Sequence, residues 1–207
     1  MKLFDYFDKT YCINLKHRTD KMELFHNEVT KYDLGEYKRV DAINGSIIEQ
    51  SFNISKGEVG LIMSNIKILE ECIKNNYKNV LIIEDDCYYT DEVTNLLDNL
   101  NLVPDDWDML YFGGNHNTHV GVTPPSKVND LIVKLHHTYT THMVAIKSHL
   151  FEKIITLISD YKNPIDVTYT ELQKKYNVYC FYPGIAKQRK GYSDIQNRVD
   201  DNNLIIT

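Results

Sequence analysis

The sequence predicts an α/β fold with a Rossmann-like, mostly parallel central sheet flanked by helices. Residues 80–83 form a short apolar run rich in β-branched side chains, which is typical of a strand buried on both faces in a parallel sheet. Before this run, a strand-like segment followed by a helix-like segment occurs twice, as in crossover units that connect parallel strands. The 207 residues suit one domain, 1–207, with a sizeable core.

The first crossover unit covers residues 11–31, where a short strand candidate leads through a polar loop into a helix. Asp20 and Glu23 have the spacing of a capping box at the start of that helix. The unit lacks the Gly-rich loops of dinucleotide and P-loop sites. Its loop can still present Asn14 and Arg18 to a ligand, although a solvated loop cation is the alternative interpretation of Arg18.

The second unit begins with a short strand at 37–40 and places Asp41 at the end of that strand. An acid there often accepts a hydrogen bond from a ribose or a base edge, but it is also a common turn residue. A helix over 55–76 follows, with Ser55 and Glu58 in capping-box spacing. This helix leads into the apolar strand, so the second unit positions the residues that follow that strand.

Three adjacent acids, Glu84, Asp85 and Asp86, come directly after the apolar strand. Open α/β sheets bind their ligands in the crevice at the carboxyl ends of the strands. Adjacent carboxylates repel one another, and a divalent cation with a phosphate held through it is the simplest ligand that would stabilise them. An acidic turn without a ligand is the alternative.

Composition excludes several classes of protein. The formal net charge of −6 argues against a general affinity for nucleic acid. No apolar run is long enough to span a bilayer, and acids stand near the N-terminus where a signal peptide would be apolar, so we expect a cytoplasmic protein. The cysteines lie far apart and read as reduced core thiols: Cys12, Cys72, Cys87 and Cys180.

Seven short segments between residues 11 and 195 follow, in order, the pattern of one enzyme family. They are I-N-L-x-x-R-x-x-K-M at 13–22, V-D-A-I-N-G at 40–45, E-V-G-L-I-M-S-N at 58–65, L-I-I-E-D-D at 81–86, W-D-M-L-Y-F-G at 107–113, P-I-D at 164–166 and P-x4-Q-x4-S-D-I at 183–195. Together they resemble glycosyltransferase family 25, which contains lipopolysaccharide galactosyltransferases and collagen hydroxylysine glycosyltransferases. Three features depart from its pattern: Asn65 stands where His is usual, Lys56 and Gly57 precede Glu58 where a Gly is typical, and residues 140–144 replace an Ala- and Tyr-rich segment.

The resemblance implies a GT-A fold, with a nucleotide-sugar half over about 10–112 and an acceptor half over about 113–207. It implies a metal-dependent hexosyltransferase that uses Mn²⁺ (or Mg²⁺) and takes UDP-galactose or UDP-glucose as donor. The implied acceptor is a glycan or a hydroxylysine-containing, collagen-like protein. Carboxylate ligands suit either metal ion, and a metal ion would neutralise the charge that develops on the leaving diphosphate.

Within this frame, strand alternation places Glu84 and Asp86 on one side, toward the metal, and Asp85 on the other, toward the ribose. Asp194 is the candidate for a further metal ligand, with a loop turn as the alternative. Asp166 is the implied catalytic base, although an acid in the first turn of a helix is also favoured by the helix dipole. The expected donor-binding residues are Asn14, Leu15, Arg18, Asp41, Ala42, Ser64, Asp85, Gln188 and Ser193.

Other functions stay open at this point. A catalytically weak or inactive relative that binds a UDP-sugar or a glycan would keep the fold and lose the chemistry. A nucleotidyltransferase would also use acids at a strand end with a metal. An Asp-nucleophile phosphatase is excluded, because residues 84–88 do not supply its D-x-D motif. The polar segment 136–142 is a candidate wall for the sugar or the acceptor, with a polar edge connection as the alternative.

Overall fold

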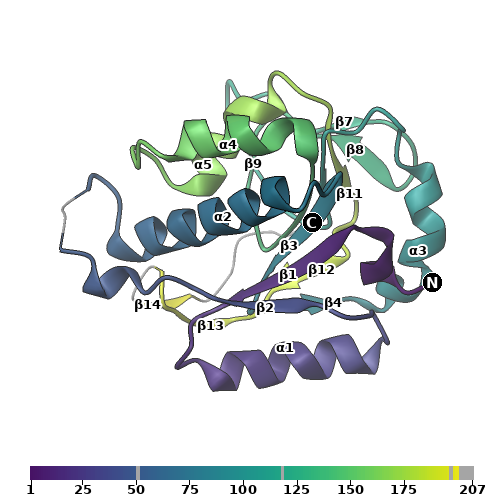
Figure 1. Cartoon of the computed structure of the whole chain (residues 1–207). Helices are drawn as coiled ribbons and strands as arrows, with labels where there is room; N and C mark the ends of the chain where they lie inside the picture. The colour runs from purple at the N-terminus through teal and green to yellow at the C-terminus, as the bar shows by residue number, and fades with distance from the viewer. Residues whose placement is uncertain (50–51, 118, 196–197, 201–207) are drawn as a thin grey trace.

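The computed structural model describes residues 1–49, 52–117, 119–195 and 198–200. In this part of the chain the central sheet has the strand order β2-β1-β3-β10-β5-β11-β8-β7. β1 is parallel to β2 and β3, and β5 is parallel to β11, whereas β10 and β8 run against the other strands. The predicted fold class, a mostly parallel sheet flanked by helices, is confirmed (Figure 1).

The strands of the central sheet are β1 (Lys9–Asn14), β2 (Lys38–Asp41), β3 (Asn79–Glu84), β5 (Met109–Tyr111), β7 (Ser126–Lys127), β8 (Ile132–Lys134), β10 (Met143–Lys147) and β11 (Val178–Phe181). Three small two-stranded sheets pair β4 (Cys87–Tyr89) with β12 (Ala186–Gln188), β6 (Asn115–His116) with β9 (Thr138–Tyr139), and β13 (Gly191–Ser193) with β14 (Arg198–Asp200). The helices are α1 (Thr19–Lys31), α2 (Lys56–Lys74), α3 (Leu96–Asn99), α4 (Phe151–Ile158) and α5 (Ile165–Gln173). Short 3-10 turns are η1 (Leu3–Tyr6), η2 (Gly45–Ile47), η3 (Asp91–Asn95), η4 (Leu100–Leu102) and η5 (Ser148–Leu150).

One edge of the sheet collects the carboxyl ends of β1, β2 and β3. The register pairs Ile13 with Glu84 and Asn14 with Asp41, so these strands end side by side. The antiparallel β10 starts at the same edge, because Met143 lies opposite Ile83. The residues just before β10 therefore meet the residues at the end of β3.

Helices cover both faces of the sheet. In Figure 1, α1 lies below the sheet, and α2, α4 and α5 lie above it. The strand β3 contributes to both layers: Leu81 and Ile83 join the core on the α1 side, and Val80 and Ile82 join the core under α2 and α4. All four are buried, which confirms the prediction of a strand covered on both faces.

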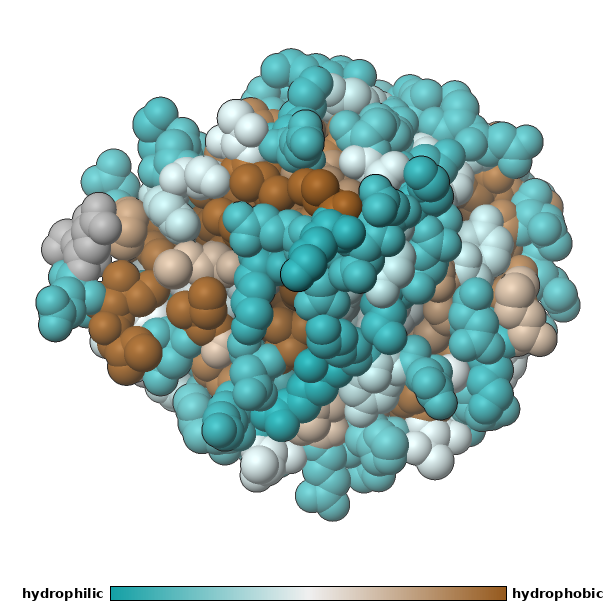
Figure 2. All heavy atoms as spheres, in the orientation of Figure 1, coloured by the Kyte–Doolittle hydropathy of each residue, from teal (hydrophilic) through white to brown (hydrophobic). Residues whose placement is uncertain are grey.

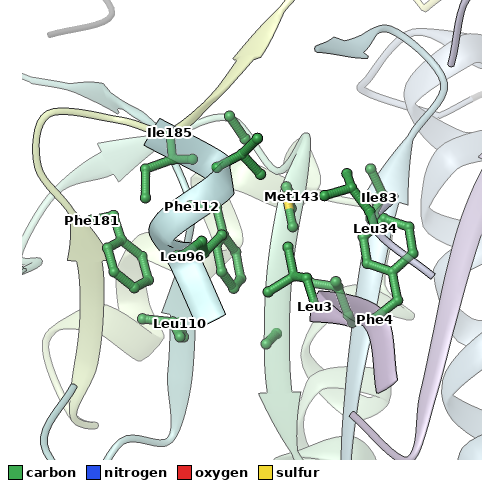
Figure 3. Packing of buried hydrophobic residues seen from close by; sticks show 14 of the residues in the cluster. Leu3, Phe4, Leu34, Ile83, Leu96, Leu110, Phe112, Met143, Phe181 and Ile185 are labelled. Carbon is green, nitrogen blue, oxygen red and sulfur yellow. The ribbon is translucent and has the colours of Figure 1, made fainter. Parts of the chain in front are cut away.

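The core on the α1 side is dense in aromatic side chains. Phe112, which follows β5, stacks on Phe181 at the end of β11 with ring centroids 5.5 Å apart. Figure 3 shows this packing around α3 and η1, with side chains from distant parts of the chain pointing toward one another. The residues labelled there are Leu3, Phe4, Leu34, Ile83, Leu96, Leu110, Phe112, Met143, Phe181 and Ile185.

The capping box predicted for α2 forms. Ser55 Oγ accepts a hydrogen bond from the Glu58 backbone N–H at 3.2 Å, and the Glu58 side chain accepts from the Ser55 N–H at 2.7 Å. The one predicted at Asp20 does not form: α1 begins at Thr19 after an N-cap residue, Arg18, that makes no side-chain cap. Asp20 instead pairs with Arg18, because it already lies inside the first turn.

Several elements are too short to be recognised in the sequence. Residues 91–102 form 3-10 turns on either side of the four-residue α3. Strands β12, β13 and β14 have three residues each, and segments of this length carry too little pattern to be recognised. The cysteines are free and buried, as expected. Within the described ranges, no helix combines the length and the apolar character needed to span a membrane.

Candidate functional site

The end of β3 places an acidic side chain deep in the protein. Glu84 is only 8% exposed. Its backbone N–H donates to the His142 carbonyl at 2.9 Å, and Thr141 Oγ1 donates to its Oε1 at 2.8 Å. The segment before β10 therefore holds both the main chain and the side chain of Glu84, a consequence of the antiparallel pairing of β10 with β3.

The acids Glu84 and Asp86 are costly to ionise together. Burial raises the pKa of Glu84 to about 8, and the nearby Asp86 carboxylate adds to that rise. Burial, with the Asp85 charge, raises the pKa of Asp86 to about 6. Asp86 Oδ1 is buried and has no hydrogen-bond partner among the described residues. A positive charge at this point would stabilise both carboxylates.

Asp85 is held differently, by the last residue of β1. Asn14 Nδ2 donates to Asp85 Oδ2 at 2.6 Å and to the Arg18 carbonyl at 2.9 Å, while Asn14 Oδ1 accepts from Arg39 Nε at 3.0 Å. Burial raises the pKa of Asp85, and the hydrogen bond from Asn14 opposes the rise. The Asn14 amide is thus occupied in orienting Asp85 and the loop before α1.

Two cavities adjoin at these acids. The β2-side cavity, of about 420 Å³, lies between the end of β1, the segment 42–46 and the start of α2. The α5-side cavity, of about 350 Å³, lies between the starts of α1 and α5 and the segment 188–193. The residues that line both are Lys21, Leu61, Glu84, Asp85, Asp86, Ser193 and Ile195.

The surface around this region is mixed in character. Figure 2 shows hydrophobic residues gathered toward the left of the molecule, the side on which the start of α2 and the β13–β14 hairpin lie in Figure 1. Exposed apolar side chains include Ile47 of η2 at 75% and Val199 of β14 at 68%. The cavities themselves are lined by charged and polar groups in addition to apolar ones.

Most of the predicted donor-binding residues line one or both cavities: Asn14, Leu15, Arg18, Ala42, Asp85, Gln188 and Ser193. Asp41 lines neither cavity; its side chain is 57% exposed and pairs with Arg39 at 3.3 Å. Ser64 also lines neither, because it is fully buried in α2. Ser64 Oγ accepts from the Ile43 N–H at 2.9 Å and donates to the Gly60 carbonyl at 2.7 Å, so it supports the cavity wall from behind.

Asp166 lines the α5-side cavity in the first turn of α5. Its two oxygens accept from separate backbone groups: Oδ2 from the Thr140 N–H at 3.2 Å and Oδ1 from the Val167 N–H at 2.8 Å. Thr140 adopts a left-handed conformation, with φ of 72°, which is uncommon for a β-branched residue. This strained turn aims one N–H at Asp166, and the next residue, Thr141, binds Glu84.

Asp194 contacts two cations. Its Oδ2 accepts from Lys21 Nζ at 2.9 Å and from Arg18 Nη1 at a shorter distance. Arg18 was expected at this site from its sequence position, but Lys21 was not. The signal was available, since residues three apart at the start of a helix share one face.

The polar segment 136–142 contributes only in part. Thr140 and Thr141 line the α5-side cavity. His142 is fully buried, and its Nε2 lies 3.0 Å from the Ala186 carbonyl. Burial lowers the pKa of His142 to about 4, so this histidine is a neutral structural link between β10 and β12.

The carboxylates at the end of β3 suit a divalent cation whose remaining ligands come from a bound substrate and from water. Among the described residues, no group of three or more His, Cys, Asp or Glu side chains is arranged to hold a metal ion. Two carboxylates, Glu84 and Asp86, with an unpartnered oxygen on Asp86, are nevertheless what Mg²⁺-like ions use when phosphates and water complete the shell. The residues therefore fit a metal that binds together with a diphosphate.

Comparison with known proteins places the chain in a family. The family model described as glycosyltransferase family 25 (LPS biosynthesis protein) matches residues 7–163, which is most of the sequence. The chain belongs to glycosyltransferase family 25. The sequence resemblance is thereby confirmed; the matched range contains the acids at the end of β3 and ends before α5 and the segment 188–195, which also line the cavities.

The curated relatives include procollagen galactosyltransferases and a family member whose name describes it as inactive. Procollagen galactosyltransferase 1-B of Xenopus laevis is 29% identical over 131 residues, covering 52% of this chain and 21% of that protein. Inactive glycosyltransferase 25 family member 3 of Homo sapiens is 24% identical over 130 residues, covering 52% and 22%. The chain thus spans about a fifth of the length of these relatives.

Two solved structures with distant likeness to this family 25 chain are a glycosyltransferase and a nucleotidyltransferase. A glycosyltransferase involved in the glycosylation of the major capsid of PBCV-1 is 9% identical, with a TM-score of 0.42 and coverage of 84% of this chain and 91% of that one. UDP-glucose pyrophosphorylase complexed with UDP-glucose is 10% identical, with a TM-score of 0.46 and coverage of 84% and 72%. These likenesses do not distinguish sugar transfer from nucleotidyl transfer.

Proposed function

We propose that this chain is a metal-dependent hexosyltransferase that moves galactose or glucose from a UDP-sugar to a hydroxyl group of a glycan or a collagen-like protein. The observation that carries the proposal is the pair of cavities that adjoin at Glu84, Asp85 and Asp86. A nucleoside diphosphate sugar has the same order of parts: a nucleoside, a diphosphate that needs a cation, and a sugar. Family 25 membership supports sugar transfer over nucleotidyl transfer.

In this proposal the nucleoside occupies the β2-side cavity and the sugar and acceptor meet in the α5-side cavity. Leu15 and Ala42 line the β2-side cavity and give it an apolar wall. Asp85, oriented by Asn14, lines both cavities and is the candidate partner of the ribose. The β2-side cavity is lined mostly by residues 13–86, whereas residues from both expected halves, about 10–112 and about 113–207, line the α5-side cavity.

Glu84 and Asp86 would hold Mn²⁺ or Mg²⁺ in this proposal. When bound, the cation neutralises the charge that develops on the leaving diphosphate. Thr141 keeps the Glu84 carboxylate in one orientation, and a hydrogen bond from Gln188 lowers the pKa of Asp86, against the larger effect of burial. The raised pKa values of both acids mean that their ionised forms gain from a nearby cation.

Asp166 is the proposed base that takes the proton of the acceptor hydroxyl. It lines the cavity assigned to the acceptor, and two backbone N–H groups fix its carboxylate. Its remaining lone pairs can accept from a hydroxyl group in the cavity.

The test measures donor binding and turnover separately, because one relative is named as an inactive family member. We expect calorimetry to show UDP binding that requires Mn²⁺ and is lost in the Glu84→Ala/Asp86→Ala double variant. UDP release from UDP-galactose or UDP-glucose should be lost in Asp166→Asn, which should still bind UDP. Mn²⁺-dependent UDP binding without turnover by the wild type would support an inactive relative, and absence of UDP binding would refute the donor site.

A further inference from the structure

At the start of α1, Arg18 and Lys21 both contact one anion, Asp194, and Arg18 also pairs with Asp20 at 2.7 Å. Arg18 and Lys21 are three residues apart, so their side chains lie on one face of the helix start. Both side chains are only 16% exposed, and both contact Oδ2 of Asp194, whose side chain is 18% exposed. Two largely buried cations on a single carboxylate oxygen form a strong anion site.

Asp194 reaches this anion site from the far end of the sequence. It follows strand β13, and the next residue, Ile195, crosses the start of α2. Ser55 Oγ donates to the Ile195 carbonyl at 3.2 Å, and a Cβ added at Gly57 would lie 2.5 Å from the Ile195 Cα. Two contacts with the main chain of Ile195 thus hold Asp194 over the cations.

The anion site lies where the two cavities adjoin. Lys21 lines both cavities, Arg18 lines the α5-side cavity and Asp194 lines the β2-side cavity. Asp194 therefore lines the same cavity as Glu84, Asp85 and Asp86, which are also acids. The positive charges of Arg18 and Lys21 compensate the repulsion between Asp194 and these acids.

We propose that Arg18 and Lys21 bind the diphosphate of the donor, and that Asp194 occupies their anion site as an internal surrogate until the donor displaces it. The inference rests on the proposed function for the identity of the donor, but not for the anion site itself. A diphosphate carries more negative charge than one carboxylate and presents several acceptor oxygens to the same two cations. Lys21 then becomes a binding residue, and Asp194 an intramolecular competitor of the donor.

The direct test measures inorganic pyrophosphate binding by calorimetry in EDTA at low salt. Asp194→Asn removes the competing charge, and we expect it to bind pyrophosphate about 5- to 50-fold more tightly than wild type. Lys21→Gln should bind it several-fold more weakly, and adding Lys21→Gln to Asp194→Asn should remove most of the gain. Asp130→Asn is the matched control, because it deletes the same charge from an exposed pair with Lys127. Unchanged or weaker pyrophosphate binding by Asp194→Asn would overturn the inference.

A measurement on the wild type covers the case in which Asp194→Asn does not fold. Saturating pyrophosphate should raise amide hydrogen exchange in residues 191–195, as the segment leaves the cations, and leave exchange in α4 unchanged. No change in 191–195 at saturation would also overturn the inference. If Asp194 is a metal ligand instead, Asp194→Asn should weaken only Mn²⁺-dependent UDP binding.

The outcomes separate this inference from the proposed function. Tighter pyrophosphate binding by Asp194→Asn, together with no turnover of any UDP-sugar, would support the anion site and refute the hexosyltransferase. Turnover of UDP-galactose or UDP-glucose, together with unchanged pyrophosphate binding in Asp194→Asn, would support the hexosyltransferase and refute the surrogate role of Asp194.

Discussion

Replacing Glu84 by glutamine should make the metal-free protein more stable. Glutamine has the same shape, and its side-chain carbonyl can still accept the hydrogen bond that Thr141 donates to Glu84 at 2.8 Å. What it removes is a buried carboxylate that lies beside Asp86. The variant would then lose metal binding, and its folded state would become more stable. This trade-off is expected where buried charges of the same sign are kept for function.

The size of this gain in unfolding free energy follows from the pKa of Glu84. Burial raises the pKa of Glu84 from 4.5 to about 8. A rise of this size disfavours the ionised form by about 5 kcal/mol. Because Asp86 contributes to this cost and the site can relax, we expect Glu84→Gln to recover about half of it, on the order of 2–3 kcal/mol at pH 8.

The gain in unfolding free energy of Glu84→Gln over wild type should increase as the pH rises from 5 to 8. Between pH 4.5 and about 8 the folded protein keeps a proton on Glu84 that the unfolded chain has released. The free energy of unfolding of the wild type therefore falls as pH rises through this window. The difference between Glu84→Gln and wild type should be largest at pH 8 and below about 1 kcal/mol at pH 5.

Urea unfolding at pH 5 and pH 8, in EDTA, measures this difference. A gain of this size corresponds to a rise in melting temperature of about 5–10 °C. Glu70→Gln, on the exposed face of α2, is the matched control and should change little at either pH. Equal stability of Glu84→Gln and wild type at pH 8, or a loss at both pH values, would refute the reasoning.

Three further changes test how the site is supported. Thr141→Val should weaken Mn²⁺-dependent UDP binding by about 10- to 100-fold in calorimetry, whereas Thr141→Ser keeps the hydroxyl that binds Glu84 and should stay close to wild type. Gly60→Ala should destabilise the protein by about 1–3 kcal/mol in urea and weaken UDP binding, because its Cβ would lie 2.4 Å from the Ile43 carbonyl behind the β2-side cavity; wild-type stability would contradict this contact. Ser55→Ala should cost about 1 kcal/mol of unfolding free energy through loss of the α2 cap, and an unchanged urea midpoint would show that the cap is not needed.

Much of the fold could be predicted because its signals are local. The apolar run of β3 indicated a strand buried on both faces, and the structure divides it between two cores. The spacing of Ser55 and Glu58 indicated the start of α2, and both hydrogen bonds of that cap form. The cap expected at Asp20 was wrong, because its carboxylate has a competing partner in Arg18 that a capping pattern does not consider.

The sequence by itself determined the acids at the end of β3, the strands that precede them and membership in family 25. It could not determine what those acids contact. Thr141 reaches Glu84 only because β10 inserts antiparallel beside β3, and Asp194 reaches Lys21 only because the C-terminal segment crosses the start of α2. Pairings between residues so far apart in the chain depend on strand order and on close backbone packing, neither of which leaves a periodic pattern in the sequence. The acidic segment was therefore recognisable in advance, whereas its hydrogen bonds, its two cavities and its internal counter-charge were decided by the tertiary structure.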